Sequence, residues 1–282
     1  MSARKLRRSV LAWGALAPLV VVNLLPFAVM LSTALKPHDE VIAYPPHWLP
    51  TRFAWHNFVD MWTTVDFGQA AFNSVLISVS ATLLALLIAV PAAYAMSRLP
   101  FRGRGAYRQF LLVTQMLSPV LLVLGMFRMA AAIPFGDGTM ADTRLGVIIV
   151  YAAYHLAFSV WMLSAYFSTI PADLEEAAWI DGATRAQAVR RIFLPLALPA
   201  IAVTGIVTFV AGWNEFTVAL TLLRDPSRLT LPLRVVNLVA GRYSVEWNQV
   251  MAATLLATLP VAVVFALLQR YMIQGLTLGA VK

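Results

Sequence analysis

Residues 170–195 read IPADLEEAAWIDGATRAQAVRRIFLP and interrupt a chain that is otherwise strongly apolar. The acidic residues occupy the first half of this stretch and the arginines the second half. Pro171 and Asp173 lie where a helix would begin, and Gly182 is well placed to end it, because glycine adopts left-handed geometry without a Cβ clash. The pattern therefore predicts two short helices with a corner at Gly182.

Capping signatures are expected at the start of both helices. Asp173 followed by Glu176 fits a capping box for the first helix, and Thr184 followed by Gln187 repeats the signature for the second. The acidic residues of the first turn are also expected to stabilise this helix, because their negative charge interacts favourably with the unpaired amides at its N-terminus.

One face of the first short helix is expected to meet a partner. Leu174, Ala177 and Ala178 share this face by their i, i+3, i+4 spacing. The two alanines leave a shallow surface that the backbone of another protein can approach closely. A helix facing only solvent would not need such a surface.

Outside the polar stretch, the chain consists mainly of long apolar runs. Hydrophobic residues make up 60% of its 282 residues and charged residues 12%, about half the charged share of a soluble domain. Crossing a hydrocarbon core of about 30 Å takes roughly 20 helical residues. Six stretches are long enough: Val10–Leu35, Ala71–Met96, Gln109–Ile133, Leu145–Ser168, Ala197–Leu223 and Val250–Tyr271. The prediction is an all-α membrane protein, one domain over residues 1–282, with six transmembrane helices and the polar loop 171–195 between the fourth and fifth.

The distribution of lysine and arginine predicts the orientation in the membrane. With a cytoplasmic N-terminus, the inside segments carry the excess of these residues, despite four arginines in the outer segment Arg224–Arg242. Both termini and the loop 171–195 are therefore expected in the cytoplasm. The first apolar run is too long for a cleaved signal peptide and is expected to be retained.

Several classes of protein are disfavoured by composition. The net charge of +8 comes from short basic clusters between apolar runs, which does not suit a nucleic-acid-binding face. The absence of cysteine excludes disulfides and thiolate metal sites. The four histidines lack metal-ligand spacing, no glycine-rich phosphate loop follows a strand, and no nucleophile–base pair is evident. We expect no catalytic residues, no metal, no cofactor and no ATP site on this chain.

The polar loop resembles a known family motif. Glu176-Ala177-Ala178, then three residues, Gly182, nine residues and Ile192-Phe193-Leu194-Pro195 resemble the EAA loop of binding-protein-dependent ABC importer permeases. In that family the loop forms coupling helices that dock into a cleft on the ATP-binding subunit. The resemblance implies the following docking residues: Glu175, Glu176, Ala177, Ala178, Asp181 and Gly182. From the residues alone, Glu176 could instead cap its own helix and Gly182 only end it, and both roles are compatible with docking.

Other motifs are similar to those of MalG-type carbohydrate permease subunits. They are Tyr94–Arg98 before Phe101–Arg104, Trp213–Phe216, and the tail 274–282. In MalG-type proteins the C-terminal tail reaches between the two ATP-binding subunits. Carried over to this chain, that contact would involve Gly275, Thr277, Gly279 and Lys282. A frayed terminus is the alternative interpretation.

The resemblance implies a permease subunit of an ATP-driven importer in the bacterial cytoplasmic (inner) membrane. It would translocate a sugar or oligosaccharide delivered by an extracytoplasmic solute-binding protein. Its partners would be a dimer of ATP-binding subunits, a second homologous permease and membrane lipid. The alternatives are an ABC permease for a polyol, a glycerophospho-compound or another solute, and an ion-driven secondary transporter. Paired acids in the spans would favour the secondary transporter, but Glu215 stands alone.

Asn214 and Glu215 are expected about two-thirds of the way along the fifth span. An acid at such a depth is costly and normally faces a cavity or a polar partner. The two residues could line the solute pathway, or they could hold the helices together through an interhelical hydrogen bond. The sequence leaves both roles open.

Overall fold

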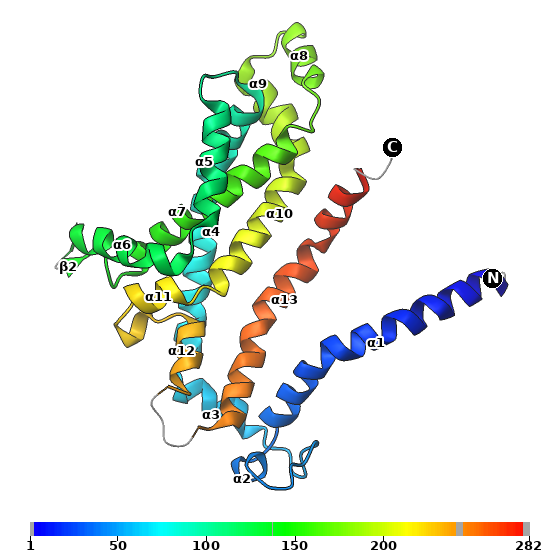
Figure 1. The fold of residues 1–282 in the computed structure, drawn as a ribbon, viewed down its shortest axis with the longest axis vertical. Helices are drawn as coiled ribbons and strands as arrows, with labels where there is room; N and C mark the ends of the chain where they lie inside the picture. Colours follow the sequence, from blue (N-terminus) through cyan, green and yellow to red (C-terminus); the bar gives the residue numbers. More distant parts are fainter. Residues whose placement is uncertain (1–2, 137, 241–244, 279–282) are drawn as a thin grey trace. The chain divides into compact units, whose positions relative to one another are not determined.

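The computed structural model describes residues 3–136, 138–240 and 245–278 (Figure 1). These residues form two compact units. Unit 1 comprises Met1–Gly68 and Arg234–Leu259, and unit 2 comprises Gln69–Leu233 and Pro260–Lys282. The expectation of one domain over residues 1–282 stays a prediction.

Helices make up most of the described chain. They are α1 (Ala3–Ala34), α2 (His38–Val41), α3 (His56–Thr64), α4 (Phe67–Arg98), α5 (Arg104–Met116), α6 (Pro119–Ala132), α7 (Arg144–Phe167), α8 (Asp173–Ile180), α9 (Arg185–Ala188), the π-helical segment η1 (Val189–Phe193), α10 (Leu194–Trp213), α11 (Thr217–Leu222), the 3-10 turn η2 (Pro226–Arg228), α12 (Leu231–Asn237) and α13 (Trp247–Leu278). The strands among the described residues are β1 (Pro134–Phe135) and β2 (Gly138–Thr139), which pair antiparallel with Pro134 opposite Thr139. The predicted all-α class is confirmed apart from this short hairpin.

Five helical stretches of the described chain are long and apolar enough to cross a bilayer: Leu16–Ala34, Phe67–Arg98, Arg144–Phe167, Arg185–Trp213 and Trp247–Leu267. The bent pair α5 and α6 supplies a sixth if it counts as one span. The six predicted spans are confirmed in this form.

The third span is not the single helix expected over Gln109–Ile133. Helices α5 and α6 meet at an angle of 101°. The backbone of Leu117 and Ser118 is extended, and Pro119 opens α6. Proline disfavours helical geometry in the residue before it and lacks the amide that would continue a helix, so the bend follows from the Ser118–Pro119 step.

The fifth span also differs from the expected Ala197–Leu223. Its helix runs without interruption from Arg185 through η1 into α10 and ends at Trp213, and α11 starts at Thr217. The Glu215 carboxylate accepts hydrogen bonds from the amides of Val218 (2.9 and 3.1 Å) and Ala219 (3.2 Å). A carboxylate at that position stabilises a new helix start, which explains why the apolar run does not continue as one helix.

The core of unit 2 forms where α4 packs among α7, α10 and α11. Alanines recur every fourth residue along α4, at positions 81, 85, 89 and 93, and all four are buried. Residues spaced by four lie on one helix face, and small side chains there let the helix backbones approach closely. Two buried clusters extend from this stripe, one reaching α7 and α11 and the other reaching α7, η1 and α10.

In unit 1, the apolar side chains of α1 are largely exposed within the chain. Leu19, Val22 and Leu25 are more than half exposed, and none of the most apolar window of this helix is buried. A bare apolar helix of this length is stable in lipid, where no water competes for its backbone groups.

A buried asparagine fixes the segment that follows α1. The side-chain amide of Asn57 donates to the carbonyls of Ala34 (2.8 Å) and Lys36 (2.8 Å). Its carbonyl oxygen accepts from the side-chain amide of Asn248 at 2.9 Å. Asn57 thereby joins the end of α1, the helix α3 and the start of α13 within unit 1.

Candidate functional site

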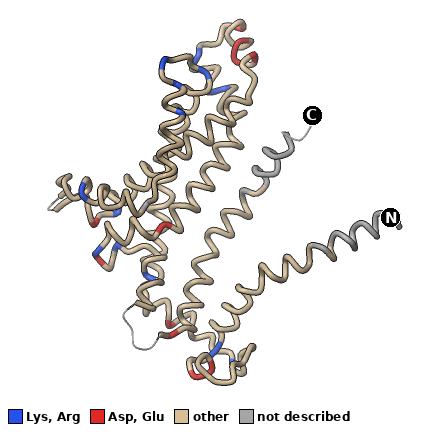
Figure 2. Tube along the Cα trace, in the orientation of Figure 1, with Lys and Arg blue, Asp and Glu red and all other residues tan. Residues whose placement is uncertain are grey.

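The polar loop forms a two-helix elbow at one end of unit 2, beyond the first turn of α5 (Figure 1). Acidic residues gather on α8, and basic residues gather near the start of α5 at the same end (Figure 2). The predicted pair of short helices with a corner between them is confirmed, as α8 followed by α9.

Gly182 makes the corner of the elbow. Its φ is +86°, in the left-handed region that favours glycine. The amide of Gly182 donates to the carbonyl of Trp179 (3.1 Å), and the amide of Ala183 donates to the carbonyl of Ala178 (2.9 Å). These two bonds form the Schellman motif that ends α8, as the sequence predicts for Gly182. A Cβ here would meet nothing within 4 Å, so backbone conformation, and not space, calls for glycine.

One of the two predicted capping boxes is present. The hydroxyl of Thr184 accepts from the amide of Gln187 (3.3 Å), and the amide of Thr184 donates to the side chain of Gln187 (2.8 Å). The box predicted at Asp173 is wrong, because the N-cap of α8 is Ala172 and no side chain caps it. Ala172 already has helical backbone angles, so Asp173 lies one position too far into the helix to cap its start.

The exposed face of α8 consists of Asp173, Leu174, Glu176, Ala177 and Ile180, and the exposed Asp181 caps its C-terminal end. Leu174 is 43% exposed and Ile180 86% exposed. Gly182 adjoins this face and is exposed as well. The face and its C-cap therefore combine apolar side chains with three carboxylates, a pattern typical of a surface that a partner covers.

Two predicted docking residues point the other way. Glu175 and Ala178 lie on the opposite side of α8 and are buried within the chain. Burial leaves these two side chains little surface for direct contact with another subunit, and their docking role stays a prediction. The 3.6-residue period of the helix separates them from the exposed face, and the family motif alone does not reveal this.

The carboxylate of Glu175 is bound inside unit 2 by residues from the end of α4. Its Oε1 accepts from Nε of Arg98 at 2.7 Å, and its Oε2 accepts from the hydroxyl of Tyr94 at 2.7 Å. Nη2 of Arg98 also donates to the carbonyl of Ile170 at 2.7 Å. Tyr94 and Arg98 are four residues apart and share a helix face, but the sequence does not name the acid that they bind.

Glu215 is fully engaged within the chain. Besides the two amides of α11, its carboxylate accepts a hydrogen bond from the hydroxyl of Tyr151 on α7 at 2.7 Å. These contacts favour the interhelical role of Glu215 over the pathway role. Asn214 is exposed and donates to the carbonyl of Val210 on its own helix at 2.9 Å. The assignment of Asn214 and Glu215 to the solute pathway stays a prediction.

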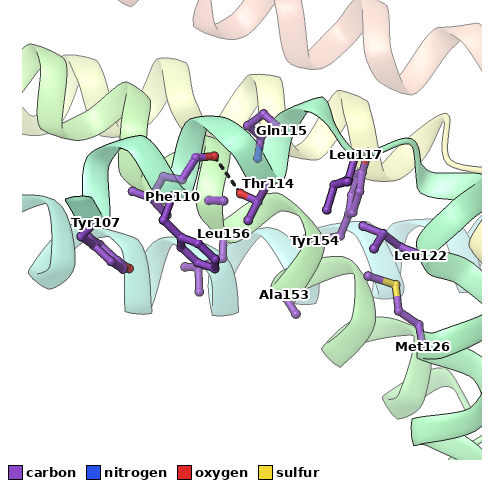
Figure 3. A pocket seen from close by; sticks show the side chains of 12 residues that line it. Tyr107, Phe110, Thr114, Gln115, Leu117, Leu122, Met126, Ala153, Tyr154 and Leu156 are labelled. Atoms are coloured by element: carbon purple, nitrogen blue, oxygen red, sulfur yellow. Dashed lines mark hydrogen bonds between the residues drawn. The ribbon is translucent and has the colours of Figure 1, made fainter. Parts of the chain in front are cut away.

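A cavity of about 330 Å³ lies where α5, α6 and α7 face one another (Figure 3). Most of its lining is apolar, and its hydrogen-bonding side chains are Tyr107, Thr114, Gln115 and Tyr154. The hydroxyl of Thr114 already donates to the carbonyl of Leu111 at 2.7 Å. A polyhydroxylated solute needs more hydrogen-bonding partners than this, so the cavity does not identify a solute site.

The described residues offer no metal site, since they hold no group of three or more His, Asp or Glu side chains that could bind an ion. In the predicted tail 274–282, Gly275 and Thr277 belong to the last turns of α13. Gly279 and Lys282 lie outside the described residues. The role of this tail at an ATPase interface stays a prediction.

Apolar spans and a polar two-helix elbow define a helical membrane protein. Residues 81–278 match the family described as binding-protein-dependent transport system inner membrane component. The chain belongs to this family of ABC transporter permeases, as the EAA-loop resemblance predicts.

Individual relatives support the assignment over the full length. The chain is 34% identical over 269 residues to the inner membrane ABC transporter permease protein YcjP of Escherichia coli (strain K12), covering 95% of this chain and 94% of YcjP. It is 32% identical over 284 residues to the trehalose/maltose transport system permease protein MalG of Thermococcus litoralis, covering 100% of this chain and 99% of MalG. The fold is similar, with a TM-score of 0.78 and 22% identity, to a chain of a bacterial ABC transporter involved in the import of the acidic polysaccharide alginate, covering 96% of this chain and 98% of the other.

Proposed function

We propose that this permease translocates a sugar or oligosaccharide and receives its driving force through the exposed face of α8, which docks on an ATP-binding subunit. The observation that carries this proposal is the elbow itself. Its corner is fixed by the Schellman motif at Gly182, and its exposed face presents Leu174, Ile180 and the Glu176 carboxylate. The sugar class is supported by the names of relatives such as the trehalose/maltose permease.

The chemistry of the exposed face specifies its partner. Exposed Leu174 and Ile180 favour an apolar cleft, which would bury them on docking. Glu176 and Asp181 flank them and favour a cationic side chain at the rim. An ATP-binding subunit whose cleft combines both features fits this face.

The fold provides a path from the docking face to the spans. The helix that starts at Arg185 continues through η1 and α10 to Trp213, so the second arm of the elbow and the fifth span are one helix. Closure of the ATP-binding dimer would displace the elbow, and the continuous helix would carry that displacement into the bundle as a rigid-body movement. The pathway would thereby open alternately to the two sides of the membrane.

The proposed orientation places the elbow in the cytoplasm. The end of unit 2 that carries the elbow also carries Arg98, Arg102, Arg104, Arg108, Arg185, Arg190 and Arg191. Such an excess of arginine favours the cytoplasmic side. The solute-binding protein would then act at the opposite face, and a second homologous permease would complete the pore.

The alternative of an ion-driven transporter is disfavoured by the surroundings of Glu215. A proton-relay acid needs a free path to a second titratable group, whereas this carboxylate holds two backbone amides and the Tyr151 hydroxyl. The alternatives of a polyol or a glycerophospho-compound concern only the solute. Thermal-shift screening of the cognate binding protein with sugars, polyols and glycerophosphodiesters distinguishes them, and a response only to a non-sugar contradicts the sugar class.

Charge reversal on the exposed face of α8 tests docking. Glu176→Lys should reduce the amount of ATP-binding subunit that co-purifies with the permease while membrane insertion stays normal. Asp39→Lys is the matched control, because Asp39 is an exposed acid outside the elbow. Wild-type co-purification and transport with Glu176→Lys would exclude the proposed docking role.

A further inference from the structure

Arg98, the last residue of α4, contacts three other segments at once. Its Nε donates to Glu175 on α8 at 2.7 Å, and its Nη2 donates to the carbonyl of Ile170, in the turn between α7 and α8, at 2.7 Å. Its guanidinium carbon lies 5.2 Å from the ring centroid of Phe193 in η1. One side chain thus connects the end of α4 to the first arm of the elbow and to the helix that continues into α10.

The Arg98–Glu175 pair is largely withdrawn from solvent. The side chains of Arg98 and Glu175 are 13% and 4% exposed, respectively. A pair buried to this extent is retained only with good geometry and satisfied hydrogen bonds, and both conditions hold, since Tyr94 binds the second carboxylate oxygen. The planar guanidinium supplies separate nitrogens to Glu175 and to Ile170, which a lysine ammonium cannot reproduce with the same fixed directions.

Aromatic packing extends the connection to the spans. The fully buried ring of Phe193 packs edge-on against Phe167, at the end of α7, and against Tyr94 on α4, with centroid distances of 4.9 Å in both cases. Closely packed interiors transmit displacement because they cannot be compressed. A movement of α8 that carries Glu175 would therefore reach α4 through Arg98 and reach α10 through Phe193.

We propose that Arg98 is a positioning residue that makes α8 move as one body with α4 and α10, so that displacement at the docking face reaches the spans. This inference rests on the proposed docking function and adds the element that converts docking into transport. The two neighbouring acids then have different roles. Glu176 is exposed and would contact the ATP-binding subunit, whereas Glu175 is buried and binds Arg98.

The test measures how much solute enters per ATP hydrolysed. The complete transporter, with its ATP-binding subunits, partner permease and binding protein, is reconstituted in proteoliposomes. Arg98→Lys and Glu175→Gln should lower this ratio about fivefold or more, within the usual range of coupling between distant sites, while the ATP-binding subunit still co-purifies. Tyr94→Phe removes one hydroxyl from the same network and should lower the ratio less. Arg102→Lys is the matched control, because Arg102 is exposed at the same end of unit 2 and should leave the ratio unchanged.

A purely structural role predicts a different result. It would reduce the yield of assembled complex and leave the ratio per assembled complex unchanged, and that outcome overturns the proposal. If the single variants fail to assemble, Arg98→Met combined with Glu175→Met removes both charges, which restores folding in many buried pairs. An assembled double variant with the wild-type ratio also overturns the proposal. Failure of the docking function itself is distinguished by Glu176→Lys, which would then leave the ATP-binding subunit bound.

Discussion

Substitution of Gly182 tests the elbow most sharply, because the structure isolates one physical cause. A side chain at this position meets no atom within 4 Å, so the φ of +86° is the source of strain. A left-handed backbone costs an L-residue roughly 1–2 kcal/mol, more for a β-branched residue and less for asparagine. A free energy of about 1.4 kcal/mol corresponds to a factor of ten in affinity. If docking requires the left-handed corner, Gly182→Ala should therefore weaken docking about 5- to 30-fold.

The assay is titration of the detergent-solubilised permease with the purified ATP-binding subunit. We expect the affinity to fall in the order wild type, Gly182→Asn, Gly182→Ala, Gly182→Val. Gly105→Ala is the matched control, because Gly105 also has nothing within 4 Å but is the second residue of α5 and has no positive φ. Alanine there should instead favour the helix, by at most about 1 kcal/mol, the value for a helix interior. The reasoning would be refuted if the three Gly182 variants bound the ATP-binding subunit with the same affinity as one another. It would also be refuted if Gly105→Ala weakened binding as much as Gly182→Ala does.

Three further predictions concern residues that stabilise the fold. Thr184→Ala removes the capping box of α9 and should cost about 1 kcal/mol, whereas Thr184→Ser should restore it; thermal unfolding of the purified permease checks both. Glu215→Gln weakens the contact with Tyr151 and should lower the thermal unfolding midpoint, by about 2–4 °C for each kcal/mol of unfolding free energy lost, while the KM for uptake stays unchanged. A changed KM at unchanged stability would instead favour the pathway role. Asn57→Asp keeps the size of the buried side chain but loses both donated hydrogen bonds, so it should destabilise the permease by about 1–3 kcal/mol, measured by denaturant unfolding. Wild-type stability would contradict the role of this amide.

Short-range signals in the sequence predict the elbow well. Gly182 and the Thr184–Gln187 pair lie within a few residues of the groups that they bind, so their roles follow from local chain geometry. Asp173 shows the limit of this reasoning, because the exact residue at which α8 begins depends on the preceding turn. A shift of one position changes a capping residue into an ordinary first-turn residue.

Long-range contacts could not be predicted in the same way. Glu175 and Arg98 are far apart in the chain, and only the packing of α8 against the end of α4 brings them together. The sequence places Glu175 beside Glu176 in one motif, although the first is buried and the second is exposed. Glu215 is similar, since its partner Tyr151 lies on another helix.

Apolar runs predict the number of spans better than their continuity. Hydropathy is summed over a window and does not register the Ser118–Pro119 step, where the third span bends by 101°. It also does not register the new helix start that Glu215 creates within the fifth apolar run. In both places a single residue changes the backbone while the average hydropathy stays high.

Cross-linking from Ile180 tests the central claim most directly. The natural chain has no cysteine, so Ile180→Cys places a single thiol on the exposed face of α8, at a residue that is 86% exposed. In membranes that contain the assembled transporter, a short thiol cross-linker should join this position to the ATP-binding subunit. Labelling of the same thiol by a membrane-impermeant reagent added to intact cells, without a cross-link to that subunit, would contradict the account.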